Sequence, residues 1–395
     1  MGKRIPMEGN IAVANAMRQI NPDIVAAYPI TPQTETVQAF AKFVADGLVD
    51  TDVIRVESEH SAMSACIGAG AAGARVFTAT SANGMALMWE MLYIAASLRL
   101  PIVMAMVNRA LSGNINIHCD HSDSMGARDS GWIQIYAENG QEAYDNFIQS
   151  VRIAEAARLP VMCCYDGFII SHAFETLEVE DDAAVRAFVG DYTPAYSVLD
   201  VEHPITVGPL DLFDFYFEHK ISEIKAYKPA QEAIIKVGKE FGATFGREYG
   251  LFEAYELDDA EEVIVCLSST AGSVKDVIDE MRAEGRKVGL LKPRLFRPFP
   301  AKEYVEALSG AKSIAVLDRA ESFGAYTAPL YTELAAAMKV FGKDTPMINY
   351  VYGLGGREIN LDHIRSVYAD LVEAKGGVDP ENIKRFLGVR GEVTL

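Results

Sequence analysis

The sequence is poor in cysteine, and the cysteines that it has follow no recognised pattern. It contains five in 395 residues, at positions 66, 119, 163, 164 and 266. None forms C-x-x-C, and such scattered residues predict neither a disulfide framework nor an iron–sulfur cluster. If the function requires clusters, another chain must therefore supply them.

Basic residues and long apolar runs are also scarce. Lys and Arg number 36 against 55 Asp and Glu, a formal net charge of −19, whereas phosphate binding requires the opposite excess. No apolar run reaches the roughly 18 residues of a membrane span, and residues 1–6 contain no apolar signal core. We therefore expect a cytoplasmic protein whose partners include neither nucleic acid nor a membrane.

Several catalytic and nucleotide-binding motifs are absent or out of place. The sequence has no G-x-S-x-G and no G-x-x-x-x-G-K-[ST], so nothing indicates a hydrolase or an ATPase. A literal G-x-G-x-x-G lies at 68–73, but it closes a helical run that begins near Ser61 and precedes a strand at 75–80. A dinucleotide site needs the reverse order of strand, glycines and helix. We interpret this run as a small-residue helix with Gly73 at its C-terminal cap.

The first 175 residues alternate between helices and short apolar strands. We predict strands at 24–28, 53–56, 75–80, 100–107 and 159–165, a helix over 34–46, and a turn at 81–84 before a helix that reaches Ser97. The last two strands are continuous apolar runs. Such runs are typical of a parallel sheet that is buried on both faces between helices.

The rest of the chain divides into an irregular segment and a second α/β unit. Residues 177–259 lose the alternating pattern, apart from a charged helix at about 229–241, and we predict a connector or clamp there. Strands at 262–267, 288–291 and 313–317, with helices at 274–284 and near Glu303, indicate a smaller open sheet. We therefore predict an α/β protein whose domains span 1–176 and 260–395, joined by 177–259.

Glu59 is the first candidate for chemistry. It follows Ser58, a good N-cap residue, at a point where a strand meets a helix. Parallel α/β sheets bind their ligands at that edge. A carboxylate at a helix start also stabilises the helix dipole, so a structural role stays open.

Two loops at the same edge of the sheet carry further candidates. Pro29 and Pro32 fix the loop after the first strand and hold Thr31 between them. Arg109 follows the strand that ends at Val107, and its fork of N–H donors suits a carboxylate. A simple turn and a rim salt bridge are the structural alternatives for these two loops.

The run His118-Cys119-Asp120-His121, with Asp123, resembles a metal site in composition alone. Consecutive residues do not easily converge on one ion, and no recognised ligand spacing is present. We therefore predict no metal site in this chain.

Seven segments of the sequence are similar to one family. They are AAYPITPQTE, VESEHSAMSACIGAGAAGARVFTATS, LRLPIVMAMVNRALS, HCDHSD, DSGWIQIYAENGQEA, DGFIISH and LKPRLFRPFP. In this order they resemble the α subunit of the 2-oxoacid:ferredoxin oxidoreductases, the pyruvate synthase group. The resemblance implies a pyrimidine-binding thiamine diphosphate domain at 1–176 and a transketolase C-terminal-like domain at 260–395.

The same resemblance implies partner subunits. A β subunit shares the thiamine diphosphate and carries its diphosphate end, the magnesium ion and a [4Fe-4S] cluster. The G-D-G…N motif for the diphosphate and the metal is absent here, which disfavours a self-contained thiamine enzyme. A γ/δ-type or fused ferredoxin-like subunit carries further [4Fe-4S] clusters, ferredoxin accepts the electrons, and we expect a dimer of protomers.

The resemblance also assigns roles to the candidate residues. Glu59 is the catalytic carboxylate, which binds N1′ of the cofactor's pyrimidine ring and promotes removal of the thiazolium proton. Pro29 lies against the cofactor. Thr31 and Arg109 hold the carboxylate of the substrate.

The loop after Arg109 bears on the choice of substrate. Pyruvate enzymes read close to R-A-L-S-A-P-I-N-I-W, whereas Asn114 and His118 replace the proline and the aromatic residue here. Polar groups in a pocket suit a second carboxylate better than a methyl group. We therefore predict oxalate, cleaved to two CO₂ without coenzyme A, with Asn114 as a substrate ligand. Pyruvate with coenzyme A is the alternative, and a non-catalytic scaffold subunit is an alternative of another class.

Overall fold

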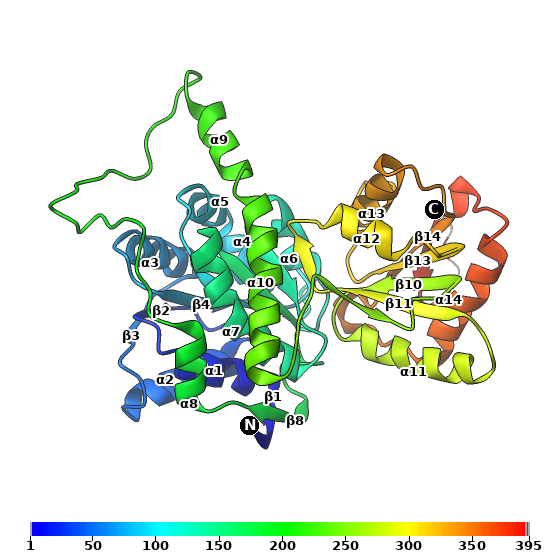
Figure 1. Ribbon diagram of the computed structural model, residues 1–395, viewed down its shortest axis with the longest axis horizontal. Coiled ribbons are helices and arrows are strands. Elements are labelled where there is room, and N and C mark those ends of the chain that lie inside the picture. The colour runs from blue at the N-terminus through cyan, green and yellow to red at the C-terminus, as the bar shows by residue number, and fades with distance from the viewer. Residues whose placement is uncertain (1, 392, 394–395) are drawn as a thin grey trace.

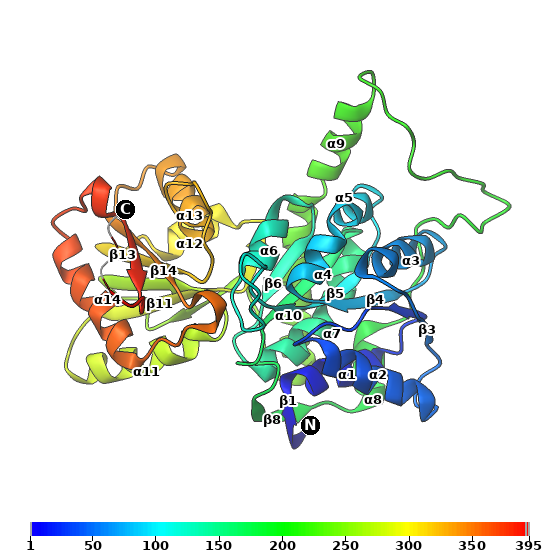
Figure 2. The same cartoon turned by 180° about the vertical axis from the view of Figure 1, so that it is seen from behind.

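The computed structural model of the chain describes residues 2–391 and 393. These residues form two α/β lobes, each built around its own sheet, and one long segment extends away from the N-terminal lobe (Figure 1). The view from behind shows the two lobes joined side by side, with the two ends of the chain on different lobes (Figure 2). None of the helices in the described residues is long and apolar enough to cross a membrane.

The N-terminal lobe is built on a seven-stranded sheet. Its strand order is β12 (Leu295–Arg297), β6 (Ile133–Tyr136), β7 (Val161–Asp166), β5 (Val103–Asn108), β4 (Val76–Thr80), β2 (Ile24–Ala26) and β3 (Asp52–Ile54). All neighbouring strands are parallel except the edge pair β12–β6. Strands β4, β5 and β7 are buried at every position, and for β5 and β7 the apolar runs predict this.

Helices cover both faces of this sheet. One face carries α1 (Gly9–Ile20), α2 (Thr34–Ala45), α7 (Gly140–Ala157), α8 (Asp182–Val189) and α10 (Tyr227–Phe245). The other face carries α3 (Glu59–Ala71), α4 (Ala82–Leu87), α5 (Trp89–Ser97), α6 (Ser122–Gly126) and the 3₁₀ turn η1 (Ala127–Asp129). Alternate residues of β5 supply the two cores, since Val103 and Ala105 pack on one face and Met104 and Met106 on the other.

A small ribbon lies beside the N-terminal lobe. Strand β1 (Lys3–Glu8) pairs antiparallel with β8 (Phe174–Val179), which follows the last parallel strand of the lobe. This pairing ties the start of the chain to the end of the lobe. The extended segment that comes later carries α9 (Tyr216–Ile224).

The C-terminal lobe is built on a six-stranded sheet. Its order is β15 (Lys384–Leu387), β14 (Met347–Tyr352), β13 (Ser313–Asp318), β10 (Glu262–Cys266), β11 (Val288–Pro293) and β9 (Phe252–Tyr255). Only the edge pair β11–β9 is antiparallel. The helices are α11 (Thr270–Ala283) and α14 (Leu361–Ala374) on one face and α12 (Ala301–Ala307) and α13 (Pro329–Val340) on the other, with 3₁₀ turns η2 (Leu354–Gly356) and η3 (Pro380–Asn382).

The two lobes share one apolar core. The core that includes Trp132 and Tyr136 of the N-terminal lobe continues through Phe296 to Tyr304 of α12 and Met338 of α13. Because this core is continuous, the C-terminal lobe is packed against the N-terminal one over an apolar contact rather than tethered by a linker alone.

The predicted α/β class with parallel sheets is confirmed, but several elements differ from the prediction or were not predicted, and three of these lie in the N-terminal lobe close to the carboxyl edge or the lobe contact. The predicted turn at 81–84 is the start of helix α4. Strand β6 was not predicted, because it has four residues and carries the buried Gln134, whose amide donates to the Ser124 carbonyl at 2.7 Å. Strand β12 follows the start of the second α/β unit in sequence, yet it pairs with β6. The domain limits 1–176, 177–259 and 260–395 stay a prediction.

Candidate functional site

Glu59 is the first residue of α3 and is buried, with 6% of its surface exposed. The side chain of Ser58 accepts a hydrogen bond from the Ser61 amide, so Ser58 is the N-cap that the sequence predicts. The Ser61 hydroxyl donates to Glu57. Within the described residues no group hydrogen-bonds the Glu59 carboxylate, and its oxygens are not among the fully enclosed polar atoms of the chain. The carboxylate is therefore open to a ligand.

Gly84 of α4 lies directly against this carboxylate. A Cβ added to Gly84 would stand 2.7 Å from Oε1 of Glu59 and 2.4 Å from Oγ1 of Thr80. The hydroxyls of Thr80 and Ser81 are themselves buried without a hydrogen-bond partner in the described chain. The junction of β4 and α4 therefore gathers several unsatisfied polar groups around Glu59, at the carboxyl edge of the sheet.

The structure brings Arg109 and Thr31 together, although through the backbone of Thr31. Nη1 of Arg109 donates to the Thr31 carbonyl at 2.7 Å, and Nε donates to the Asn116 carbonyl at 2.9 Å. Burial lowers the pKa of Arg109, but a guanidinium remains charged at any ordinary pH. Nη2 has no hydrogen-bond partner among the described residues, so it is a donor still available for a ligand. Pro29 and the Thr31 side chain are exposed at the same loop.

Asp123 connects the Arg109 strand to the Gly84 helix. Its Oδ2 accepts from the amides of Arg109 and Ala82, both at 2.9 Å, and its Oδ1 accepts from the Asn108 side chain at 2.9 Å and the Ser124 amide at 2.7 Å. Burial raises the pKa of Asp123 to about 7, against the lowering effect of these four donors. The sequence presented Asp123 only as a rejected metal ligand, and it showed no signal of this positioning role.

The C-terminal lobe braces the loop after Arg109. Nδ2 of Asn116 donates to the Gly355 carbonyl at 2.9 Å, and the Gly355 amide donates to Asp120 at 3.0 Å. The Gly356 amide donates to the Cys119 carbonyl at 2.7 Å. Arg109 therefore rests on a loop whose shape depends on a glycine turn of the other lobe.

Asn114 and His118 are exposed on this loop. Asn114 makes no hydrogen bond within the described residues, while the His118 ring lies 5.2 Å from the ring of Phe168. Within the described residues no hydrogen bond or ion pair joins Asn114 to another candidate residue. Its assignment as a substrate ligand stays a prediction.

The ligand-like atoms of Cys119, His121 and Asp166 lie within 4.8 Å of one another. His121 Nε2 is 2.8 Å from one carboxylate oxygen of Asp166, and Arg319 Nη1 donates to the other at 2.7 Å. Burial alone would raise the pKa of Asp166. The charges of His121 and Arg319 together have a larger, opposite effect, so the net shift of this pKa is downward. His121, Asp166 and Arg319 form an ion-pair network between the lobes, in which the guanidinium of Arg319 is paired with the carboxylate of Asp166.

The cysteines of the described chain are buried and unpaired. Burial raises the pKa of the thiols of Cys66, Cys163 and Cys266 to about 12, so these side chains are neutral and act as small apolar groups. Among the described residues only Cys163 and Cys164 are adjacent, and they follow each other on β7. Nothing in this part of the chain has the four-thiolate arrangement of a cluster.

Comparison with known families identifies both lobes. Residues 15–239 match the family described as "Pyruvate flavodoxin/ferredoxin oxidoreductase, thiamine diP-bdg", and residues 260–364 match "Pyruvate:ferredoxin oxidoreductase core domain II". The fold is similar to that of 2-oxoglutarate:ferredoxin oxidoreductase from Magnetococcus marinus. That similarity has a TM-score of 0.73 at 19% identity, over 94% of this chain and 66% of the other.

Curated relatives match over nearly the whole chain. Pyruvate synthase subunit PorA of Thermotoga maritima is 56% identical over 98% of both chains. Ketoisovalerate oxidoreductase subunit VorA of Pyrococcus horikoshii is 44% identical over 95% of this chain and 96% of its own. The chain therefore belongs to the thiamine-diphosphate-dependent 2-oxoacid:ferredoxin oxidoreductase family, as its α subunit.

Proposed function

We propose that the chain is the α subunit of a multi-subunit enzyme that oxidises pyruvate with coenzyme A and passes the electrons to ferredoxin. The observation that carries the proposal is the buried Glu59 carboxylate, which has no partner in the described chain and lies against Gly84. The identity of 56% to a pyruvate synthase subunit supports the choice of pyruvate.

The residues around Glu59 fit thiamine diphosphate. A carboxylate without a partner and the unpaired buried hydroxyls of Thr80 and Ser81 offer polar contacts to a ring rich in nitrogen. When bound, the cofactor supplies the carbon nucleophile and the electron sink for decarboxylation. In this proposal Glu59 holds a proton at a pyrimidine nitrogen and Pro29 lies against the ring.

Arg109 and Thr31 bind the substrate carboxylate in this proposal. The guanidinium is held by two backbone carbonyls through Nη1 and Nε, so Nη2 is fixed in direction while it remains available. The carbonyl that accepts from Nη1 belongs to Thr31 itself, so the Thr31 hydroxyl is part of the same residue that Arg109 holds. A donor held in place in this way binds a carboxylate without losing much side-chain entropy.

Partner subunits supply what this chain lacks. We propose a β subunit with the diphosphate end, the magnesium ion and a [4Fe-4S] cluster, and a ferredoxin-like subunit of γ/δ type with further clusters. The buried, scattered cysteines of the described chain support this division of labour. We expect a dimer of such protomers in the cytoplasm.

The comparisons favour pyruvate over oxalate as the substrate. Relatives similar over nearly their whole length are named for pyruvate and for ketoisovalerate, both of which carry an apolar group beside the keto carbon. Asn114 and His118 make the loop polar and keep oxalate as a second candidate, but Asn114 is exposed and its side chain makes no hydrogen bond within the described residues. A polar group that is not held in place adds little to specificity.

The test is reduction of a viologen or of ferredoxin by the assembled, oxygen-free complex. Pyruvate, 2-ketoisovalerate and oxalate are each supplied with and without coenzyme A. Activity with pyruvate that depends on coenzyme A supports the proposal, and activity with oxalate alone overturns the choice of substrate. Glu59→Gln should abolish activity, with Glu57→Gln in the preceding loop as the matched control. Full activity of Glu59→Gln would instead support a scaffold role.

A further inference from the structure

Residues 191–226, here called the arm, leave the N-terminal lobe and return to it. Figure 1 shows the arm in green, extended away from both sheets, with α9 on its returning half. Its outgoing end is anchored where the Ser197 hydroxyl donates to the Ala72 carbonyl at 2.6 Å, and its returning end where Lys220 donates to Ser97 at 2.6 Å. Within the described chain, residues 199–215 make no hydrogen bond to anything outside the arm.

The arm exposes large apolar side chains along most of its length. Phe213 is 91% exposed and Leu210 is 89% exposed, and α9 has no buried residue. The others are Val198, Leu199, Val201, Ile205, Val207, Leu212, Phe215, Tyr216, Phe217, Ile221 and Ile224. Monomeric proteins rarely expose a contiguous apolar surface of this extent, and such surfaces mark binding to another molecule.

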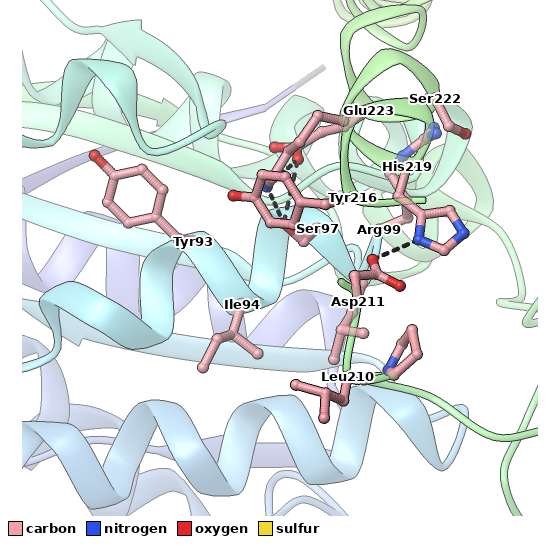
Figure 3. Close-up of a pocket in the computed structure, with 14 residues that line it drawn as sticks. Tyr93, Ile94, Ser97, Arg99, Leu210, Asp211, Tyr216, His219, Ser222 and Glu223 are labelled. Carbon is pink, nitrogen blue, oxygen red and sulfur yellow. Dashed lines mark hydrogen bonds and ion pairs between the residues drawn. The ribbon is translucent and has the colours of Figure 1, made fainter. Parts of the chain in front are cut away.

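A pocket lies between the arm and α5 (Figure 3). Its volume is about 540 Å³, and its apolar walls are Tyr93, Ile94 and Leu98 of the lobe and Leu210 and Tyr216 of the arm. The polar groups beside it are already engaged, since Asp211 pairs with His219 at 2.5 Å and Lys220 pairs with Glu223 at 2.8 Å. The pocket therefore suits apolar side chains of a second chain.

The charge of the arm restricts what that second chain is. The only lysines of the arm are Lys220 and Lys225, and acidic residues outnumber them. The acidic residues are Asp191, Asp200, Glu202, Asp211, Asp214, Glu218 and Glu223. A second copy of this chain would bring its own net charge of −19 against them. Like charges across a contact are costly, and complementary ones guide association. The partner surface must therefore be apolar at its centre and rich in Lys and Arg at its rim.

The position of the arm points to a subunit of the same complex. The arm packs on α5, which follows α4, and α4 carries the Gly84 that borders Glu59. Trp89, Tyr93 and Ile94 of α5 are themselves partly exposed apolar residues. The apolar surface thus runs from the arm towards the candidate site, which itself requires another chain for completion.

We infer that the arm is a docking element that a different, basic-rimmed subunit of the oxidoreductase complex covers, placing its apolar side chains on α9 and in the pocket beneath. The inference rests on the proposed function, because it takes the chain to work inside a hetero-oligomer. The arm has no core of its own, and ordering so long a segment costs conformational entropy. In this inference, contacts with the other subunit offset that cost.

Photo-cross-linking in the purified complex tests this assignment directly. Phe213→p-benzoylphenylalanine is compared with Val340→p-benzoylphenylalanine, since Val340 is 80% exposed at the end of α13. We expect Phe213 to cross-link to another type of subunit, within a segment that contains Lys or Arg, and Val340 to give no such product. A cross-link to a second copy of this chain, or none from Phe213, overturns the inference.

Two pairs of variants test the chemistry of the contact. Phe213→Asp with Phe217→Asp should lower recovery of the assembled complex at least tenfold, while Val340→Asp leaves it unchanged. Asp214→Lys with Glu218→Lys should lower it similarly, compared with Asp276→Lys on α11. Because these side chains are exposed, thermal unfolding of the separate chain should not change. Normal recovery of both arm variants overturns the inference.

Assembly and catalysis are separable in this design. Glu59→Gln should assemble fully and lack activity, whereas the arm variants should fail to assemble. A complex that assembles through the arm but oxidises no 2-oxoacid would refute the proposed function and leave the docking role standing. The opposite result, an active complex with a mutated arm, would refute the docking role alone.

Discussion

The carboxylate of Glu59 lies so close to Gly84 that a Cβ on the glycine would stand 2.7 Å from Oε1. The same Cβ would stand 2.4 Å from the Thr80 hydroxyl. Real Cβ atoms essentially never approach a neighbour within 3.0 Å. The missing side chain at position 84 is therefore what leaves room for the buried carboxylate at the start of α3.

Gly84→Ala is expected to displace Glu59 and to lower kcat about 100-fold, because a shift of roughly 1 Å in a reacting group has an effect of that size. Overpacking of the buried turn should also cost about 1–3 kcal/mol in the free energy of unfolding. Steady-state kinetics of the assembled complex with pyruvate and urea unfolding of the chain measure the two effects.

Gly68→Ala is the matched control for this change. Gly68 lies in α3, and a Cβ there meets nothing within 4 Å. Ala is the better helix former by about 1 kcal/mol, so this variant should be slightly more stable, with kcat unchanged within about twofold. An unaltered kcat in Gly84→Ala would contradict the close approach of Glu59.

Arg109→Lys tests the guanidinium group that links the loop of Thr31 to the loop of Asn116. Arg109 donates at once to the carbonyls of Thr31 and Asn116, and a lysine cannot reproduce that geometry. Loss of one or two charge-assisted hydrogen bonds predicts a rise of about 10- to 100-fold in the KM for pyruvate. Arg55→Lys is the control, because Arg55 is exposed and makes no ion pair within the described residues. Equal KM values in both variants would remove Arg109 from the substrate site.

Gly355→Ala tests the bracing by the C-terminal lobe. Gly355 has φ +59°, and a Cβ there would stand 2.4 Å from Nδ2 of Asn116. The displaced Asn116 should release Nε of Arg109 and raise the KM for pyruvate. Gly342→Ala carries similar backbone strain, since φ is +70°, but its Cβ meets nothing. If both variants destabilise the chain and leave KM unchanged, the glycine turn has no role in positioning Arg109.

The sequence was sufficient for the parts of the fold that depend on local pattern. The apolar runs of β5 and β7 predicted buried parallel strands because each such strand packs helices on both faces. The four-residue β6 and the start of α4 were missed, since Gln134 interrupts the apolar run and Asn83-Gly84 has the composition of a turn. The pairing of β12 with β6 joins residues about 160 apart in sequence, which no local pattern encodes.

The residues of the candidate site, too, could be predicted only where a local sequence pattern marks them. Glu59, Thr31 and Arg109 could be named because each follows a predicted strand at the carboxyl edge, and the structure joins the last two by a hydrogen bond. Gly84, Asp123 and the contact of Asn116 with Gly355 could not be named. That contact spans 239 positions, and it depends on how two lobes pack rather than on residue type or spacing.

Asp123 should make the stability of the chain depend on pH. Burial raises its pKa to about 7 in the folded chain, whereas an unfolded aspartate titrates near pH ~3.9. Between these values the folded state holds a proton that the unfolded state has released. The contribution of Asp123 to the free energy of unfolding is therefore present at about pH 4 and is lost as the pH rises to about 7.

Asp123→Asn removes this dependence, because the amide is neutral at every pH and similar in shape to the protonated acid. As the pH rises from about 5 to about 8, wild type should lose stability relative to Asp123→Asn, as measured by urea unfolding at each pH. Asp276→Asn is the control, since an exposed aspartate on α11 should leave the pH profile of wild type unchanged. A constant difference between wild type and Asp123→Asn would mean that the carboxylate is already ionised in the folded chain at about pH 5. Its four N–H donors would then outweigh the cost of burying its charge.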